Sequence, residues 1–213
     1  MVQARLTEST VREYTARLAS GEPTPGGGSA AALVGALAAA LGEMVGNFTV
    51  GKEKFAAVEE EVRAILAVLT VQREKLLDLT DEDAAAYAGV GAAYALPKGT
   101  EEEKVARTAA IQEALRAAAQ VPLAVCDGCL SVMGTLEDLR ARGNPNLLSD
   151  VAVAAEFCCA AMRCACLNVD VNLAYLKDEA YVAETRAALD ERRECLESVS
   201  RALFDRILAQ IRG

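Results

Sequence analysis

A carboxylate and two phenols share one helical stripe in the middle of the chain. Asp83, Tyr87 and Tyr94, with Val90 between the tyrosines, are spaced so that their side chains lie on one face of a helix. Asp81 lies two residues before Asp83. A partly buried carboxylate with a pKa raised toward neutrality can both accept and donate a proton. The stripe therefore predicts acid–base chemistry; the structural alternative is that both aspartates are exposed at a helix bend, where aspartate is common.

Two amides lie one helical turn apart inside a second apolar segment. Asn168 and Asn172 flank Asp170 in the run Cys-Leu-Asn-Val-Asp-Val-Asn-Leu. Buried amides need hydrogen-bond partners, and two roles would supply them. The amides could cap neighbouring helix ends, which is the commoner role, or they could hold the donor and acceptor edge of a heteroaromatic ligand.

A glycine-rich turn precedes the least charged part of the chain. Residues 23–29 read Pro-Thr-Pro-Gly-Gly-Gly-Ser, and Ser29 is placed to cap a following Ala/Leu-rich helix. Free N–H groups at such a helix start can bind an anion; the alternative is a tight turn before a core helix. The sequence lacks a neighbouring strand pattern and a Gly-Lys-Ser ending, so the turn is not a nucleotide-binding P-loop.

Two cations flank a rigid turn later in the chain. Lys98 follows Leu-Pro, and Arg107 lies nine residues downstream. These side chains could meet a carboxylate-bearing ligand, although solvated charge is the simpler explanation.

The chain contains no histidine and seven cysteines. The lack of histidine excludes Ser-His-Asp and Cys-His catalysis within the chain. Cys126 and Cys129 have metal or redox spacing, but no second pair matches it, so they are expected to be buried small hydrophobes. Four further cysteines are expected to pack on one helix: Cys158, Cys159, Cys164 and Cys166. Their apolar contexts predict reduced thiols and a cytoplasmic protein.

Composition and charge restrict the fold and the partners. Hydrophobic residues make up 53% of the chain and aromatic residues 4%, which favours close-packed helices over sheets. The net charge of −9 without a basic run argues against a nucleic-acid partner. No signal peptide pattern starts the chain. The longest uncharged run, residues 23–42, is expected to be a buried core helix rather than a membrane span.

The helical period recurs along nearly the whole sequence, and no alternating strand pattern is present. We expect helices over residues 10–18, 29–47, 54–95, 100–142, 149–175 and 179–211. A bend is expected near residues 80–81, a stop at Pro97, a capping box from Thr100 to Glu103, and a kink or break at Pro122. Ser149 or Asp150 should cap the fifth helix. The sequence thus predicts an all-α, single-domain, up-and-down-type bundle over residues 1–213, with Ala-rich faces that favour a homo-oligomer.

These segments together resemble the cyclodeaminase/cyclohydrolase family, which includes the cyclodeaminase half of formiminotransferase-cyclodeaminase and free-standing methenyltetrahydrofolate cyclohydrolases. The matching segments are residues 23–30, 44–52, 81–84, 96–98, 143–146 with Ser149 and Asp150, and 168–173. The resemblance spans nearly the whole chain in order, and it implies an all-helical homodimer. It also implies a tetrahydrofolate derivative as the substrate, with no cofactor and no metal. The charge and composition, for their part, predict no nucleic-acid partner and no membrane.

The resemblance implies a reaction at the carbon that bridges the pterin-ring nitrogen and the arylamine nitrogen of tetrahydrofolate. In cyclodeamination, the arylamine attacks a formimino carbon and ammonia leaves. In the cyclohydrolase reaction, water opens the cationic methenyl bridge to give formyltetrahydrofolate. We expect cyclodeamination, with cyclohydrolysis as the alternative. Alternatives of other classes are a non-catalytic folate-binding helical dimer and a Cys-based metal sensor.

The resemblance also implies roles for individual residues. It places the acid–base aspartate in the segment that holds Asp81 and Asp83, and we expect Asp83, with Asp150 and Asp170 as further candidates. Asn168 and Asn172 would orient the pterin, while Lys52, Lys98 and Arg107 would meet the glutamate tail. The full expected substrate-binding set is Gly26, Gly27, Gly28, Ser29, Lys52, Tyr87, Lys98, Arg107, Asn144, Asp150, Asn168 and Asn172.

Overall fold

The computed structural model describes residues 5–213, and within that range the chain forms helices and no strands. The all-α prediction is therefore confirmed. The elements, in order, are η1 (Leu6–Glu8), α1 (Val11–Leu18), α2 (Gly27–Asn47), η2 (Glu53–Val58), α3 (Glu59–Tyr94), α4 (Glu101–Arg142), η3 (Pro145–Leu147), α5 (Leu148–Leu173) and α6 (Glu179–Arg212).

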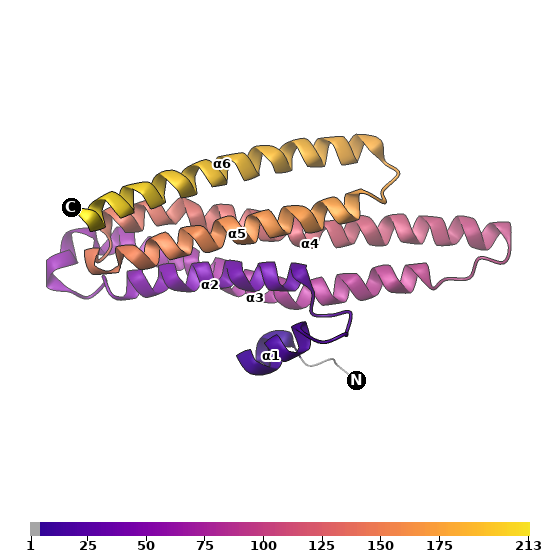
Figure 1. The fold of residues 1–213 in the computed structure, drawn as a ribbon, viewed down its shortest axis with the longest axis horizontal. Coiled ribbons are helices and arrows are strands. Elements are labelled where there is room, and N and C mark those ends of the chain that lie inside the picture. Colours follow the sequence, from indigo (N-terminus) through magenta and orange to yellow (C-terminus); the bar gives the residue numbers. More distant parts are fainter. Residues whose placement is uncertain (1–4) are drawn as a thin grey trace.

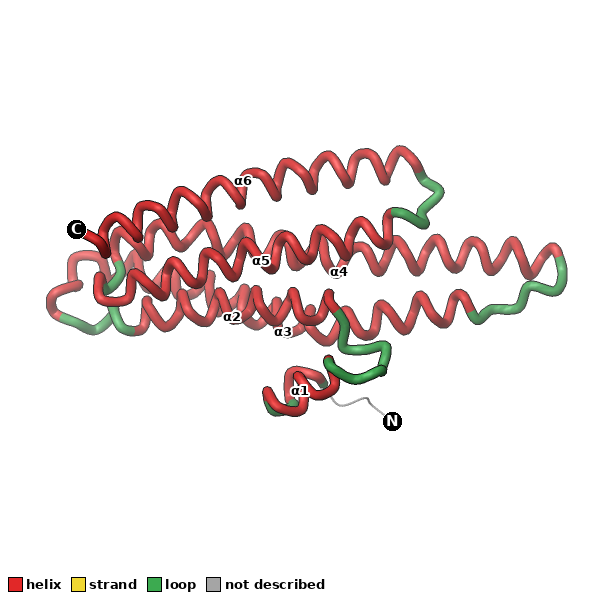
Figure 2. Tube along the Cα trace, in the orientation of Figure 1, coloured by secondary structure: helices red, strands yellow, loops and turns green. Residues whose placement is uncertain are grey.

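Five long helices lie side by side along one axis (Figure 1). Helices α2 to α5 pack against one another, and α6 lies along the outside of α5 and α4. Figure 2 shows the short α1 outside the bundle, joined by a loop to the start of α2 partway along the bundle's length. The start of α2 and the turn between α3 and α4 lie toward the same end, and the α2–α3 and α4–α5 connections lie at the other.

Small residues on α2 bring it close to α3. A Cβ on Gly46 would come within 2.6 Å of the Leu66 side chain, and one on Gly42 within 2.9 Å of Leu69. Buried alanines fill the same helix face, among them the fully buried Ala32. The low aromatic content therefore gives a core in which helices approach closely instead of one filled by large rings.

Several helix ends agree with the sequence predictions. Thr100 and Glu103 form the expected capping box at the start of α4. Helix α3 ends at Tyr94, three residues before Pro97. Thr10 caps α1, with Glu13 completing a second capping box.

Two local predictions about the helices are wrong. Helix α4 continues through Pro122, so the predicted break there does not occur. Helix α3 likewise continues through Thr80 and Asp81, and a bend near these residues or a kink at Pro122 stays a prediction. Pro122 is buried, so tertiary packing of α4 offsets the hydrogen bond that proline removes. Neither Ser149 nor Asp150 caps α5, because η3 runs directly into that helix and Leu147 occupies the capping position.

Two helices, α2 and α4, have the length and hydropathy of a membrane span. About half of each apolar window is buried within the bundle, at 56% for α2 and 50% for α4. The core helix of a soluble protein passes the same test, so this finding is weak evidence for a membrane span.

Candidate functional site

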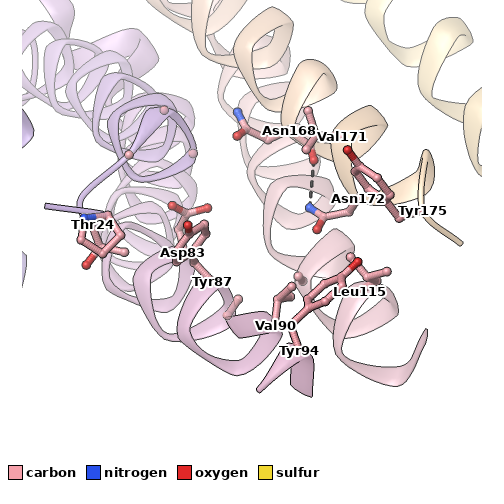
Figure 3. Close-up of a pocket in the computed structure, with 16 residues that line it drawn as sticks. Thr24, Asp83, Tyr87, Val90, Tyr94, Leu115, Asn168, Val171, Asn172 and Tyr175 are labelled. Carbon is pink, nitrogen blue, oxygen red and sulfur yellow. Dashed lines mark hydrogen bonds between the residues drawn. The ribbon is translucent and has the colours of Figure 1, made fainter. Parts of the chain in front are cut away.

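A cavity of about 560 Å³ opens beside the first turn of α2. Its walls come from residues 23–28, from the second half of α3, from the middle of α4 and from the C-terminal end of α5. Figure 3 shows Thr24 and Asp83 on one side of the cavity and Asn172 and Tyr175 on the other. The site is therefore assembled from segments that lie far apart in sequence, from Pro23 to Tyr175.

Asp83 is the one acidic side chain among the described residues that line this cavity. Its Oδ2 accepts a hydrogen bond of 2.9 Å from the Ser29 N–H. A Cβ on Gly28 would lie 2.0 Å from Asp83 Oδ1, so the carboxylate packs directly against the backbone of α2. Burial raises the pKa of Asp83, and the Ser29 N–H opposes this only in part. The group can therefore exchange a proton nearer to neutral pH than an ordinary aspartate.

The predicted stripe on α3 is confirmed as a common face. Asp83, Tyr87, Val90 and Tyr94 all line the cavity. Tyr87 is 57% exposed and Tyr94 is 45% exposed, which leaves their rings accessible from the opening. The alternative of two exposed aspartates is wrong, because Asp81 and Asp83 are both half-buried.

Asn168 and Asn172 face the cavity from α5. Each amide donates to the carbonyl one turn earlier in its own helix: Asn168 Nδ2 lies 2.8 Å from Cys164 O, and Asn172 Nδ2 lies 2.9 Å from Asn168 O. Neither amide caps a neighbouring helix. Within residues 5–213, neither Oδ1 accepts a hydrogen bond, so both remain available to a ligand donor.

Sequence reasoning missed Tyr175 as a residue of the site. Tyr175 is 64% exposed and lines the cavity together with Leu115 of α4. A signal was available, since residues 168, 172 and 175 have the spacing of one helical face. Leu115 carried no comparable signal, because only the packing of α4 against α3 and α5 brings it to the cavity.

Asp81 lies outside the cavity and holds the N-terminal segment. Its carboxylate accepts hydrogen bonds from Arg5 Nε at 2.9 Å, from Thr7 Oγ1 at 2.7 Å and from the Leu6 N–H. Burial alone would raise the pKa of Asp81, but the hydrogen bonds from Thr7, Arg5 and Leu6 outweigh burial and lower it. The Asp81 carboxylate therefore stays ionised and bonded to the N-terminal segment, whereas the pKa of Asp83 is raised.

The glycine turn lies at the cavity, although Ser29 has a different role from the one expected. Gly26, Gly27 and Gly28 line the cavity. Gly26 holds the capping position of α2, so the prediction that Ser29 caps the helix is wrong. Ser29 is fully buried inside the first turn, and its hydroxyl lies 2.9 Å from the Tyr14 hydroxyl. The Ser29 hydroxyl therefore bonds to Tyr14 of another helix, whereas the sequence analysis expected it to cap the start of α2.

The expected cations of the site lie at its edge or far from it. Arg107 donates to Tyr94 O at 2.9 and 3.2 Å, and its guanidinium lies 5.6 Å from the centre of the Tyr94 ring. Lys98 is exposed in the turn between α3 and α4, just beyond Tyr94. Lys52 precedes η2, at the other end of the bundle.

Asn144 and Asp150 also lie away from the cavity within one chain. The Asn144 N–H donates to Thr49 Oγ1 at 2.9 Å in the connection between α4 and α5. Asp150 is in the first turn of α5, 18 residues before Asn168, which corresponds to about 27 Å along a helix. Lys52, Asn144 and Asp150 therefore do not reach this cavity within one chain, and their predicted contacts with a ligand stay predictions.

The cysteine pair with metal spacing is buried, as expected. Cys126 and Cys129 are fully buried between α4 and α5, where they contact the thiols of Cys166 and Cys158. Among the described residues, no group of three or more Cys, Asp or Glu side chains is placed to hold a metal ion. The packing role predicted for Cys164 is wrong, because Cys164 lies on the outward face of α5 and is exposed.

Known proteins resemble this chain along most of its length. Residues 10–191 match the sequence profile of the formiminotransferase-cyclodeaminase family. The methenyltetrahydrofolate cyclohydrolase of Methylorubrum extorquens is 44% identical over 85% of this chain and 87% of that protein. The formimidoyltransferase-cyclodeaminase of Rattus norvegicus is 36% identical over 85% of this chain, which spans only 34% of that protein. A crystal structure of formiminotetrahydrofolate cyclodeaminase from Thermotoga maritima is 35% identical, with a TM-score of 0.78 and 94% of each chain covered.

Proposed function

The chain belongs to the formiminotransferase-cyclodeaminase family, and from this premise we propose that Asp83 is the acid–base residue of a reaction at the one-carbon bridge of tetrahydrofolate. The enzymes that it resembles act on folate derivatives, and the chain is a folate one-carbon enzyme. The observation that supports the role of Asp83 is its position. It is the acidic group of the cavity, and it is held by a backbone N–H at the start of α2.

A single carboxylate is sufficient for the proton transfers of the proposed reactions. In hydrolysis, water attacks the methenyl carbon and gives one proton to Asp83 as the tetrahedral intermediate forms. The proton then passes to the ring nitrogen as its bond to that carbon breaks. The hydroxyl of the intermediate gives its remaining proton to solvent as the formyl C=O forms, so the cationic substrate and water yield the neutral formyl product and one released proton. In cyclodeamination, the arylamine nitrogen attacks the formimino carbon, Asp83 takes its proton and returns it to the departing nitrogen, and ammonia leaves.

The other cavity residues suit a flat ligand that carries a positive charge. The two free Oδ1 atoms of Asn168 and Asn172 can accept from the N–H groups of a pterin ring. Tyr87, Tyr94 and Tyr175 offer accessible ring faces along the opening. While ionised, Asp83 stabilises a cationic one-carbon bridge.

Of the two reactions, we place hydrolysis of the methenyl bridge first. Its support is the 44% identical cyclohydrolase, which this chain matches over 87% of the relative's length. Cyclodeamination is the second candidate, supported by the Thermotoga maritima cyclodeaminase structure. The transferase activity named for the longer relatives is not part of this proposal, because the chain spans about a third of their length.

The deciding experiment follows the methenyl absorbance with each substrate and purified protein. Methenyltetrahydrofolate should lose its absorbance faster than in buffer if hydrolysis is the activity, and formiminotetrahydrofolate should gain it if cyclodeamination is. Side-by-side kcat/KM values rank the two. A wild-type protein that turns over neither substrate, but is stabilised against heat by folate, would support a non-catalytic folate-binding protein instead.

The Asp83→Asn variant tests the proposed acid–base residue. We expect turnover to fall by at least about 100-fold, because the amide cannot exchange the proton, while the Ser29 N–H can still donate to the amide oxygen and the fold is retained. Asp127→Asn is the matched control, since Asp127 is an exposed residue of α4 that pairs with Arg192 of α6 and lies outside the cavity. Near-normal turnover by Asp83→Asn would move the catalytic role to another residue.

The remaining expectations on assembly and location are also proposals. We propose that the chain functions as a cytoplasmic homodimer that needs no redox cofactor, because neither reaction transfers electrons. Support for the dimer comes from α2 and α5, which pack together and leave large apolar side chains exposed, among them Leu37 and Leu167.

A further inference from the structure

The N-terminal segment, residues 5–25, meets the bundle at two places close to Asp83. At the first place, Arg5, Leu6 and Thr7 donate hydrogen bonds to Asp81, two residues before Asp83 on α3. At the second, Tyr14 of α1 meets Ser29 in the first turn of α2. Residues 23 and 24, at the end of this segment, form part of the cavity wall.

Tyr14 is buried although its helix has almost no core face. Of the eight residues of α1, all of them described, Tyr14 alone is buried, with 6% of its surface exposed. Val11 on the same helix is 83% exposed, and Leu18 is 38% exposed. A helix this short and exposed gains little from apolar burial, so the placement of the Tyr14 hydroxyl needs another explanation.

Ser29 connects the Tyr14 hydroxyl to the cavity carboxylate. The Ser29 hydroxyl lies 2.9 Å from the Tyr14 hydroxyl, and the Ser29 N–H donates to Asp83 Oδ2 at 2.9 Å. An N–H in the first turn of a helix has no acceptor within that helix, so this donor is free for Asp83. The lack of a side chain at Gly28 lets the carboxylate reach it.

We propose that Tyr14 is a positioning residue for the reaction: through its hydrogen bond with Ser29 it holds the first turn of α2 against Asp83 and so fixes the carboxylate toward the cavity. Tyr14 is not among the residues that line the cavity, so it would act through Ser29 and Asp83 and not by contact with a substrate. The proposal rests on the proposed function, in which Asp83 moves the proton.

The surroundings of Asp83 make the Ser29 N–H its main stabilising contact. The titratable groups near Asp83 are Tyr14 on α1 and Asp81 and Tyr87 on α3. Helix α2 has no charged residue before Glu43, and the facing residues of α4 and α5 are uncharged, including Leu115, Asn168 and Asn172. No cation among the described residues lines the cavity. A looser first turn of α2 would therefore leave the ionised Asp83 less stabilised, and its pKa would rise further.

The test compares Tyr14→Phe, Ser29→Ala and the double variant, using kcat, KM and the pH dependence of kcat/KM. We expect each single variant to lower kcat about five- to tenfold, the contribution of one hydrogen bond, with little change in KM. The acidic limb of the pH profile should move to higher pH. Because both changes break the same contact, the double variant should be no worse than the more affected single variant. Tyr181→Phe is the control, since Tyr181 accepts a hydrogen bond from Gln120 outside the cavity.

Three results would overturn the proposal: wild-type kcat and pH profile in both folded single variants, effects that multiply in the double variant, or a change in KM alone. If Tyr14→Phe does not fold, Ser29→Ala is compared with wild type instead. It removes the hydroxyl that bonds to Tyr14 and keeps the N–H that bonds to Asp83. A wild-type protein without turnover would contradict the proposed function, not this proposal. In that case, a ¹³C NMR titration of the Asp83 carboxyl, assigned with Asp83→Asn, decides: its pKa should rise in Tyr14→Phe, and an unchanged value would refute the positioning role.

Discussion

Two carboxylates that are nearly adjacent in sequence have opposite environments in this chain. Asp81 accepts three hydrogen bonds from the N-terminal segment, and its pKa is lowered despite partial burial. Asp83 faces the cavity with one backbone donor, and burial raises its pKa. Sequence analysis placed the acid–base residue in this segment and favoured Asp83. The distinction became visible only with the N-terminal residues that engage Asp81, because nothing in their types or spacing indicates that contact.

The role of Asp81 predicts an acid-sensitive contribution to stability. Its pKa in the folded chain is lower than the ordinary value of 3.8, so the ionised carboxylate stabilises the fold above about pH 4, and this contribution is lost as pH falls through the folded value. We expect Asp81→Asn to lower the free energy of unfolding by about 1–3 kcal/mol at pH 7. The difference from wild type should shrink toward pH 3. Urea denaturation at both pH values measures it.

The exposed Asp127→Asn variant is the control for this effect. Asp127 makes a surface ion pair with Arg192 at 3.5 Å, which is expected to contribute less than about 1 kcal/mol. If Asp81→Asn lost no more stability than this control at pH 7, or if its deficit were the same at pH 3, the anchoring role of Asp81 would be wrong.

At the scale of elements, the sequence predicted most helices well and their local contacts poorly. The capping box at Thr100 depends on neighbouring residues, so a sequence pattern can identify it. The role of the Ser29 side chain and the continuity of α4 through Pro122 depend on partners distant in sequence, so the predicted cap and the predicted helix break both failed. The two faces that carry Asp83 and Asn168 were each visible as helical stripes, but their convergence on one cavity follows from helix packing, which periodicity does not encode.

The junction between α2 and α3 predicts a large effect of one methyl group. In Gly28→Ala, the new Cβ would lie 2.0 Å from Asp83 Oδ1, so the carboxylate or the helix start must move. We expect turnover to fall more than about tenfold, and stability to fall by about 1–3 kcal/mol, as for other overpacked sites. Turnover assays and thermal denaturation measure the two effects.

Gly89→Ala is the matched control for this junction. A Cβ on Gly89 would meet nothing within 4 Å, and the position is exposed within α3. Alanine there should stabilise the helix by about 0.5–1 kcal/mol and leave turnover unchanged. Equal activity in Gly28→Ala and Gly89→Ala would show that the close approach of Asp83 to α2 has no functional role.

At the scale of the whole molecule, one face of the bundle lacks the charge expected of a surface exposed to water. Helix α2 has no charged residue before Glu43, and Leu37 on it is 47% exposed. On α5, which packs against α2, Leu167 is 68% exposed and Val171 is 62% exposed. Exposed apolar residues on adjacent helices favour burial against a second copy of the chain.

A substitution on this face tests the proposed dimer, and it should also affect turnover at the cavity. Light scattering should show wild type at twice the chain mass of 22.4 kDa, and Leu37→Glu should shift it toward the monomer, because a buried, unpaired carboxylate opposes association. Ile211→Glu, a change at an exposed position near the end of α6, is the control and should leave the dimer intact.

Val171 also lines the cavity, so a partner on this face would border the opening and Leu37→Glu should lower turnover as well. A monomeric wild type at micromolar concentration, or a dimeric Leu37→Glu variant, would exclude α2 as the dimer contact.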